Sequence, residues 1–148
     1  MISQLVSNIH RAWRGESLEK EAISSLELAY NCLEEAIKSA IEKREHNLGE
    51  LVWKASSELE YSLFLLSMKI GEENLPKINP SSRFDPKFKG EIGPFLVSIQ
   101  DLTAEAIKLL KKKLYSEAYE AARAARNGLL RLHTLLERQR KEKRKKKR

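Results

Sequence analysis

Residues 116–137, SEAYEAARAARNGLLRLHTLLE, carry the pattern that decides the fold. Apolar side chains recur there at alternating steps of three and four, at Ala118, Ala121, Ala122, Ala125, Leu129, Leu132 and Leu136. This spacing places them on one face of an α-helix. Because alanine is short, another helix can approach that face closely. The segment therefore predicts a helix that packs against other helices.

Similar patterns occur in the rest of the chain. Nineteen of the 21 acidic residues are glutamate, which suits helix interiors better than aspartate. Prolines and glycines concentrate in residues 71–93 and leave the other segments uninterrupted. We predict an all-α, up-and-down bundle of about five helices, in which four more helices cover residues 2–13, 17–44, 47–70 and 94–113.

A short repeat suggests that the bundle consists of two related helical hairpins. The tetrapeptide EAIK occurs at residues 35–38 and again at residues 105–108, a spacing of 70. In the helix that follows each copy, similar residues recur at a spacing of 66, such as Leu63 with Leu129 and Leu66 with Leu132. The difference of four residues falls in a turn, where insertions are best tolerated.

The composition excludes several classes of protein. Apolar residues make up 41% and charged residues 33% of the 148 residues, which is ordinary for one globular domain. Cys32 is the single cysteine, and His10, His46 and His133 are far apart, so we expect neither an internal disulfide, a local zinc motif nor a cofactor. No apolar run reaches 18 residues, and we expect a cytoplasmic protein without a membrane partner. The Lys- and Glu-rich composition is similar to that of thermophile proteins.

The positive charge of the chain lies at one end. Residues 1–137 carry a net charge of −1, whereas residues 138–148 carry +8. We therefore predict a helical domain over residues 1–137, with a long connection at 71–93, and a basic arm or helical extension over 138–148. Such a polycation binds the phosphate backbone of RNA or DNA without reading its sequence. The predicted binding residues of the arm are Arg138, Arg140, Lys141, Lys143, Arg144, Lys145, Lys146, Lys147 and Arg148.

A basic row leads into this arm. Residues seven apart lie on nearly the same side of a helix, so Arg126, His133 and Arg140 align, and Arg123 lies close to them. We add Arg123 and Arg126 to the predicted nucleic-acid-binding residues. The alternative is that the row is the solvated back of an amphipathic helix.

The connection at 71–93 contains a second candidate for nucleic-acid binding. Aromatic and basic residues alternate at Arg83, Phe84, Lys87, Phe88 and Lys89. Single-stranded nucleic acid is bound by this combination, because rings stack on bases while cations follow the backbone. The alternative is that the two phenylalanines attach a long loop to the bundle.

These observations favour a non-enzymatic protein that associates with RNA or DNA as an accessory subunit of a nucleoprotein complex. The nearly neutral body leaves helix faces for a protein partner or a second copy of the chain. A second hypothesis is a protein–protein scaffold whose basic tail is incidental.

A third hypothesis comes from one short motif. Arg126-Asn127 followed by His133 resembles the Arg-polar-spacer-His signature of the HEPN ribonucleases, which are small helical bundles that usually act as dimers. The resemblance implies that His133 would exchange a proton with the ribose 2′-hydroxyl or leaving group, while Arg126 would stabilise charge on the phosphorane.

Overall fold

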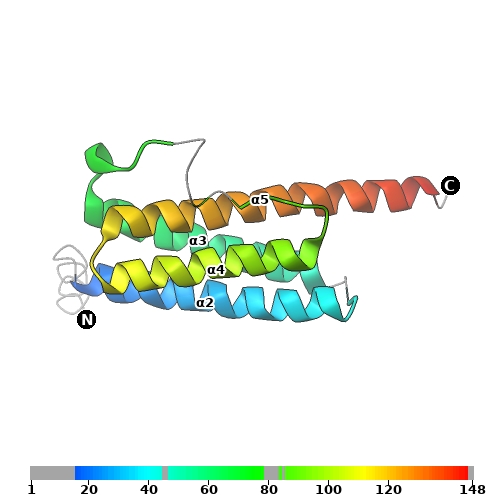
Figure 1. Cartoon of the computed structure of the whole chain (residues 1–148), viewed down its shortest axis with the longest axis horizontal. Coiled ribbons are helices and arrows are strands. Elements are labelled where there is room, and N and C mark those ends of the chain that lie inside the picture. Colours follow the sequence, from blue (N-terminus) through cyan, green and yellow to red (C-terminus); the bar gives the residue numbers. More distant parts are fainter. Residues whose placement is uncertain (1–15, 45–46, 79–83, 85, 147–148) are drawn as a thin grey trace, which may run out of the picture.

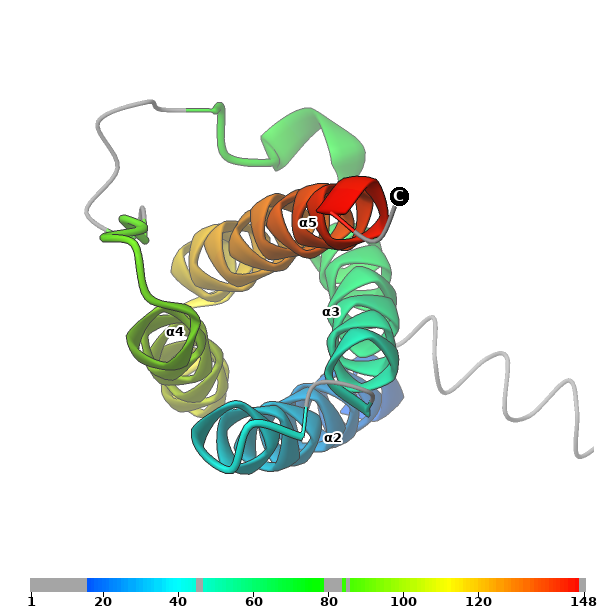
Figure 2. The ribbon, with the colours of Figure 1, turned by 90° about the vertical axis from the view of Figure 1, so that its right-hand side faces the viewer.

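In the computed structural model, long helices lie side by side around one apolar core (Figures 1 and 2). The structure describes residues 16–44, 47–78, 84 and 86–146. The described part of the chain is all-helical, as the sequence predicts, and contains α2 (Glu16–Ile41), α3 (Leu48–Ile70), the short 3-10 helix η2 (Glu72–Asn74), α4 (Ile92–Lys111) and α5 (Tyr115–Lys146). The helix expected over residues 2–13 lies outside the described residues.

The four long helices occupy the corners of a square. Both α2 and α5 pack against α3 and α4, so α2 and α5 are diagonal to each other (Figure 2). In Figure 1, α2 and α5 run in one direction, while α3 and α4 run in the other. The order is therefore up, down, down, up, which differs from the expected up-and-down order at the step from α3 to α4.

A long crossover explains this difference. Helix α3 has 23 residues and is about 35 Å long. A tight turn after α3 would have produced an antiparallel neighbour. Instead, residues 71–91 return to the other end of the bundle before α4 begins. We call these residues the crossover.

The two hairpins, α2–α3 and α4–α5, end their first helices in the same way. Lys43 and Lys113, which are 70 residues apart, both have positive φ angles, of 58° and 64°. In each hairpin the next residue donates its N–H to the carbonyl five residues back at 2.9 Å: Arg44 to Ser39, and Leu114 to Leu109. This is the hydrogen bond of a Schellman C-cap. Its recurrence at the EAIK spacing supports the relationship between the hairpins.

Burial in the second helices repeats at the spacing of 66. Six buried positions of α3 correspond to six buried positions of α5: Val52 to Ala118, Ala55 to Ala121, Leu59 to Ala125, Ser62 to Gly128, Leu63 to Leu129, and Leu66 to Leu132. No residue of α5 in these pairs is larger than its counterpart, and three are smaller. Helix α5 can therefore lie closer to its neighbours than α3 does.

Gly128 is the position of closest approach on α5. A Cβ atom there would lie 2.9 Å from Ile99 Cγ1 of α4 and 3.2 Å from Pro86 Cγ of the crossover. Glycine is thus required by space rather than by backbone conformation. The contact holds α5 between α4 and the crossover.

We expect Gly128→Ala to destabilise the protein, although alanine is the better helix former. Overpacking a tight core site costs about 1–3 kcal/mol, whereas Gly→Ala in a helix gains about 0.5–1 kcal/mol. The free energy of unfolding in urea should therefore fall, by up to about 2.5 kcal/mol. Gly49→Ala is the matched control, because the nearest atom to its Cβ is Arg140 Nη2 at 3.8 Å. A loss of stability in the control, or a gain at Gly128, would contradict this account of the packing.

Candidate nucleic-acid interface

Helix α5 continues beyond the bundle. Its last residues, 138–146, are all exposed, and Figure 1 shows them running past the ends of the neighbouring helices. The residues that the sequence predicts as an arm are thus, up to Lys146, a direct continuation of α5. These nine residues add about 13 Å of helix. We call residues 138–146 the basic extension.

Most cations of the basic extension are not neutralised from within the chain. Arg140 Nη1 lies 3.9 Å from Glu137 Oε1, and both side chains are exposed. Such a surface pair contributes little and is screened by salt. Five further cations have no carboxylate within ion-pair distance in the described part of the chain: Arg138, Lys141, Arg144, Lys145 and Lys146.

A cleft of about 300 Å³ lies where the extension leaves the bundle. It is formed between α5 and the first turn of α3 and includes His133, Arg140 and Lys143 on one side and Gly49 on the other. Glu50 and Glu137 also line the cleft. Because these carboxylates oppose the cations, the cleft is less positive than the exposed extension. It marks the base of the candidate interface.

Arg123, which the sequence places in the interface, holds the crossover. Its Nη1 donates to the carbonyl of Pro76 at 2.8 Å, and its Nη2 donates to the carbonyl of Lys77 at 3.2 Å. The guanidinium also lies 5.4 Å from the centre of the Tyr119 ring. Arg131 acts similarly further along α5, where it donates to the carbonyl of Pro86 at 3.2 Å. These arginines fix the crossover to α5.

Arg126 and His133 lie on the same side of α5 but line different cavities. Arg126 Nη1 is 3.2 Å from Glu60 Oε1 of α3, and its Nη2 donates to the side-chain oxygen of Asn127 at 3.1 Å. His133 is exposed and lines the cleft at the base of the extension. Seven residues separate the two by about 10 Å along the helix axis. The structure therefore does not bring the pair of the HEPN-like motif together at one cavity.

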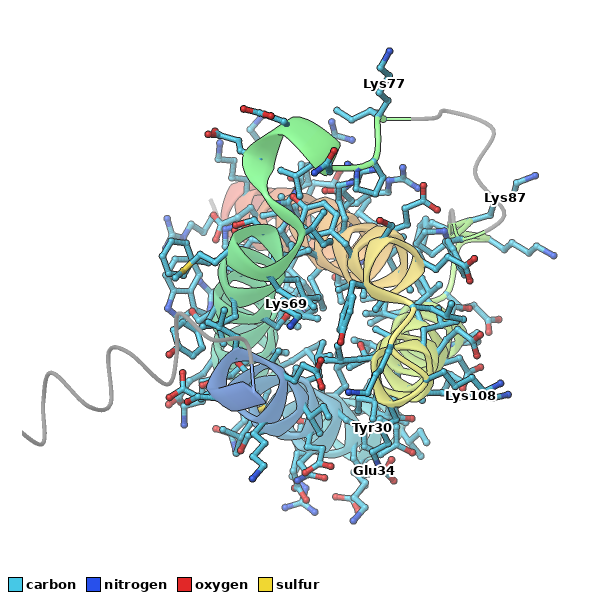
Figure 3. The ribbon with its side chains drawn as sticks, turned by 90° about the vertical axis from the view of Figure 1, so that its left-hand side faces the viewer. Tyr30, Glu34, Lys69, Lys77, Lys87 and Lys108 are labelled. Carbon is cyan, nitrogen blue, oxygen red and sulfur yellow. The ribbon has the colours of Figure 1, made fainter. Side chains whose placement is uncertain are left out.

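The aromatic residues of the crossover pack inward. Phe84 is 7% exposed and belongs to the core, and Phe88 meets Phe95 of α4 edge-on with ring centroids 5.3 Å apart. This arrangement matches the alternative in which the rings attach the loop. The crossover lysines behave differently: Lys87 and Lys89 are exposed, and Figure 3 shows Lys77 and Lys87 pointing away from the bundle. Because the phenylalanine rings pack inward, these lysines offer positive charge but no aromatic surface on which a base could stack.

Three of the predicted residues, Arg83, Lys147 and Arg148, lie outside the described residues. Over the described ranges, no three His, Cys, Asp or Glu side chains form a group that could hold a metal ion. Burial raises the pKa of the Cys32 thiol. A thiol kept protonated at neutral pH is a poor nucleophile.

Comparison of the chain with protein family models, with curated proteins and with solved structures finds no match. None of the described helices is both long and apolar enough to cross a membrane. The geometry of the chain itself must therefore support any functional proposal.

Sequence reasoning missed the role of Arg123 and Arg131 as anchors of the crossover. Their acceptors are backbone carbonyls 45–47 residues away in an irregular segment. Every residue has a backbone carbonyl, so the sequence does not show which carbonyls accept hydrogen bonds from a side chain. The available signal was the length of the connection, because a crossover that returns along a helix needs polar partners for its backbone.

We expect Arg123→Met to loosen the crossover near Lys77. The substitution keeps a long apolar stem but removes both hydrogen bonds to the carbonyls of Pro76 and Lys77. Limited tryptic digestion followed by mass spectrometry should show faster cleavage after Lys77. Arg138→Met is the matched control, because Arg138 is exposed and unpaired within the described ranges. Equal cleavage rates in the two variants would show that Arg123 does not hold the segment.

Proposed function

We propose that this chain is a non-enzymatic, nucleic-acid-associated protein that binds the phosphate backbone through its basic extension. The observation that carries the proposal is the set of five exposed cations without carboxylate partners on about 13 Å of helix that leaves the bundle. A high density of unpaired positive charge favours a polyanion, because each phosphate that is neutralised releases condensed counterions.

The geometry of the extension suits the backbone rather than the bases. Its cations surround the helix instead of forming one reading face, and Gln139 is its single side chain of the amide type that pairs with adenine. The extension is slim enough for the major groove of duplex DNA, about 12 Å wide, and can also lie along a single strand. We expect binding to both DNA and RNA, with little dependence on sequence.

In this proposal the bundle positions the basic extension but contributes little to the affinity for nucleic acid. Residues 1–137 carry a net charge of −1, so they do not attract a polyanion as a whole. Arg123 and Arg126 are engaged with the crossover carbonyls and with Glu60, and we leave both out of the interface. A neutral body with one charged helix end is the arrangement expected of an accessory subunit in a nucleoprotein complex.

The proposal does not include RNA cleavage. A ribonuclease of the HEPN type would need Arg126 and His133 to face the same phosphate. Here Arg126 is paired with Glu60 and lines a different cavity from His133. We therefore expect His133→Ala to bind nucleic acid as the parent chain does.

The test compares two variants that lose the same charge from different places. In the extension variant, Lys141, Arg144, Lys145 and Lys146 become glutamine, which keeps the helix propensity. In the control variant, four exposed body lysines become glutamine: Lys20, Lys108, Lys111 and Lys112. Binding to a duplex DNA of random sequence is measured as a function of salt concentration, with circular dichroism to confirm folding.

We expect the extension variant to bind more weakly and with a shallower salt dependence. The log–log slope should fall by up to about 0.9 for each cation that contacts a phosphate. The control variant should keep both its affinity and its slope, although its net charge is the same. If both variants lose affinity equally, net charge and not the extension drives binding, and the proposal is wrong.

A further inference from the structure

The outer side of α3 carries an apolar stripe opposite the side that faces the core. Trp53 and Phe64 are 65% and 59% exposed; Tyr61 and Met68 lie beside Phe64 at helical spacing, and the exposed Ser57 lies between Trp53 and Tyr61 on the same side. We call the four apolar residues the α3 stripe; it is about 22 Å long. Contiguous exposed apolar patches on a protein surface mark places where something else packs.

The corresponding side of α5 shows what covers such a face in this fold. Under the shift of 66 residues, Trp53 corresponds to Tyr119, which is partly buried, and Phe64 corresponds to Leu130, which is 50% exposed, so this side of α5 is covered only in part. There the segment that precedes α4 lies along α5. It is attached through Arg123 and Arg131 and has Pro86 packed close to Gly128. In the second hairpin, the chain before the first helix thus packs on the outside of the second helix.

Residues 1–15 have the equivalent place in the sequence of the first hairpin, because they precede α2 as the crossover precedes α4. Under the shift of 70 residues, Leu18 corresponds to Phe88, and both side chains pack against the core. Leu18 also lines a cleft of about 640 Å³ together with Phe64 and Met68. Leu18, near the start of the described chain, therefore lies at the end of the α3 stripe that holds Phe64 and Met68.

The sequence of this segment suits the stripe. Its apolar residues follow the spacing of one helix face: Ile2, Leu5, Val6, Ile9 and Trp13. A helix over residues 2–13 would be about 18 Å long, close to the length of the stripe. Arg11 and Arg14 lie off the apolar face, and the stripe is bordered by Glu21, which accepts a hydrogen bond from Tyr61, and by Glu60.

We propose that residues 2–13 form an amphipathic helix that docks on the α3 stripe of the same chain. The segment runs parallel to α3, with Trp13 near Met68 and Leu5, about 12 Å further along, near Tyr61. Docking covers apolar residues on the outer side of α3, as the crossover covers part of the outer side of α5. The proposal concerns the free chain and does not depend on nucleic-acid binding.

The test places a nitroxide spin label near the start of the segment. Gln4→Cys provides the attachment site in the full chain, and Cys32→Ser removes the single native thiol. The measurement is paramagnetic broadening of backbone amide signals. We expect the amides of residues 53–60 to lose most of their intensity. The amides of α4 should keep theirs, because α4 is diagonal to α3.

Two further variants separate docking from nonspecific proximity. Ile9→Glu places a charge on the apolar face of the segment and should remove the broadening. Ser7→Glu places the same charge on the opposite face and should leave it unchanged. Phe64→Glu alters the stripe itself, at an exposed position that folding does not require, and should also remove the broadening.

A mixed sample tests whether the contact is within one chain. Spin-labelled chains without ¹⁵N are combined with ¹⁵N-labelled chains that carry no spin label. No broadening in this sample supports docking within the chain. Broadening in the mixed sample would show that the segment reaches a second copy and would overturn the proposal. Absence of broadening in the labelled chain, or equal effects of Ile9→Glu and Ser7→Glu, would overturn it as well.

Discussion

The close packing of α5 between α4 and the crossover is the contact on which the rest of the structure depends. Gly128 leaves no room for a Cβ atom between Ile99 and Pro86. Because the crossover must pass over α5 at this point, α3 and α4 can occupy diagonal corners and run in the same direction. The same contact fixes the first half of α5 on two sides. Residues 138–146, which have no such cover, continue beyond the bundle in the direction of the helix.

The helices could be predicted from the sequence because the buried side of a helix requires apolar residues at regular spacing. The stripes that run through Leu26, Leu33 and Ala36 in α2 and through the alanines of α5 are fully buried in the structure. The boundaries were less predictable. Helices were predicted to begin at residues 47 and 94, whereas α3 begins at Leu48, with no capping hydrogen bond from the Asn47 side chain, and Pro94 is the third residue of α4 rather than the first. Local residue type indicates where a helix can begin but not which backbone groups find other partners.

Periodicity carries no information about how helices are arranged, and this explains the difference in topology. An apolar stripe shows that a helix packs, but it does not show whether the next helix is adjacent or diagonal. Charge is ambiguous in the same way. Arg123 and Arg138 look alike in sequence, yet Arg123 donates to crossover carbonyls while Arg138 is exposed and unpaired within the described part of the chain. Only the return path of residues 71–91 distinguishes an anchoring arginine from a free one.

The helical state of the basic extension links its structure to the proposed binding. Like charges three and four residues apart destabilise a helix by about 0.2–0.5 kcal/mol per pair, and residues 138–146 carry seven cations and one acid. Part of this lost helix stability is recovered, because cations near the C-terminus of a helix interact favourably with the negative end of the helix dipole. Apolar contacts do not stabilise this part of the helix, because residues 138–146 are exposed. A polyanion relieves the remaining repulsion and so stabilises the helix that it binds. Salt therefore acts in two opposing ways: it screens the repulsion that weakens the free extension, and it lowers the free energy gained when condensed counterions are released on binding. The second effect grows with the number of phosphates engaged, so binding weakens with salt even as the free helix becomes more stable.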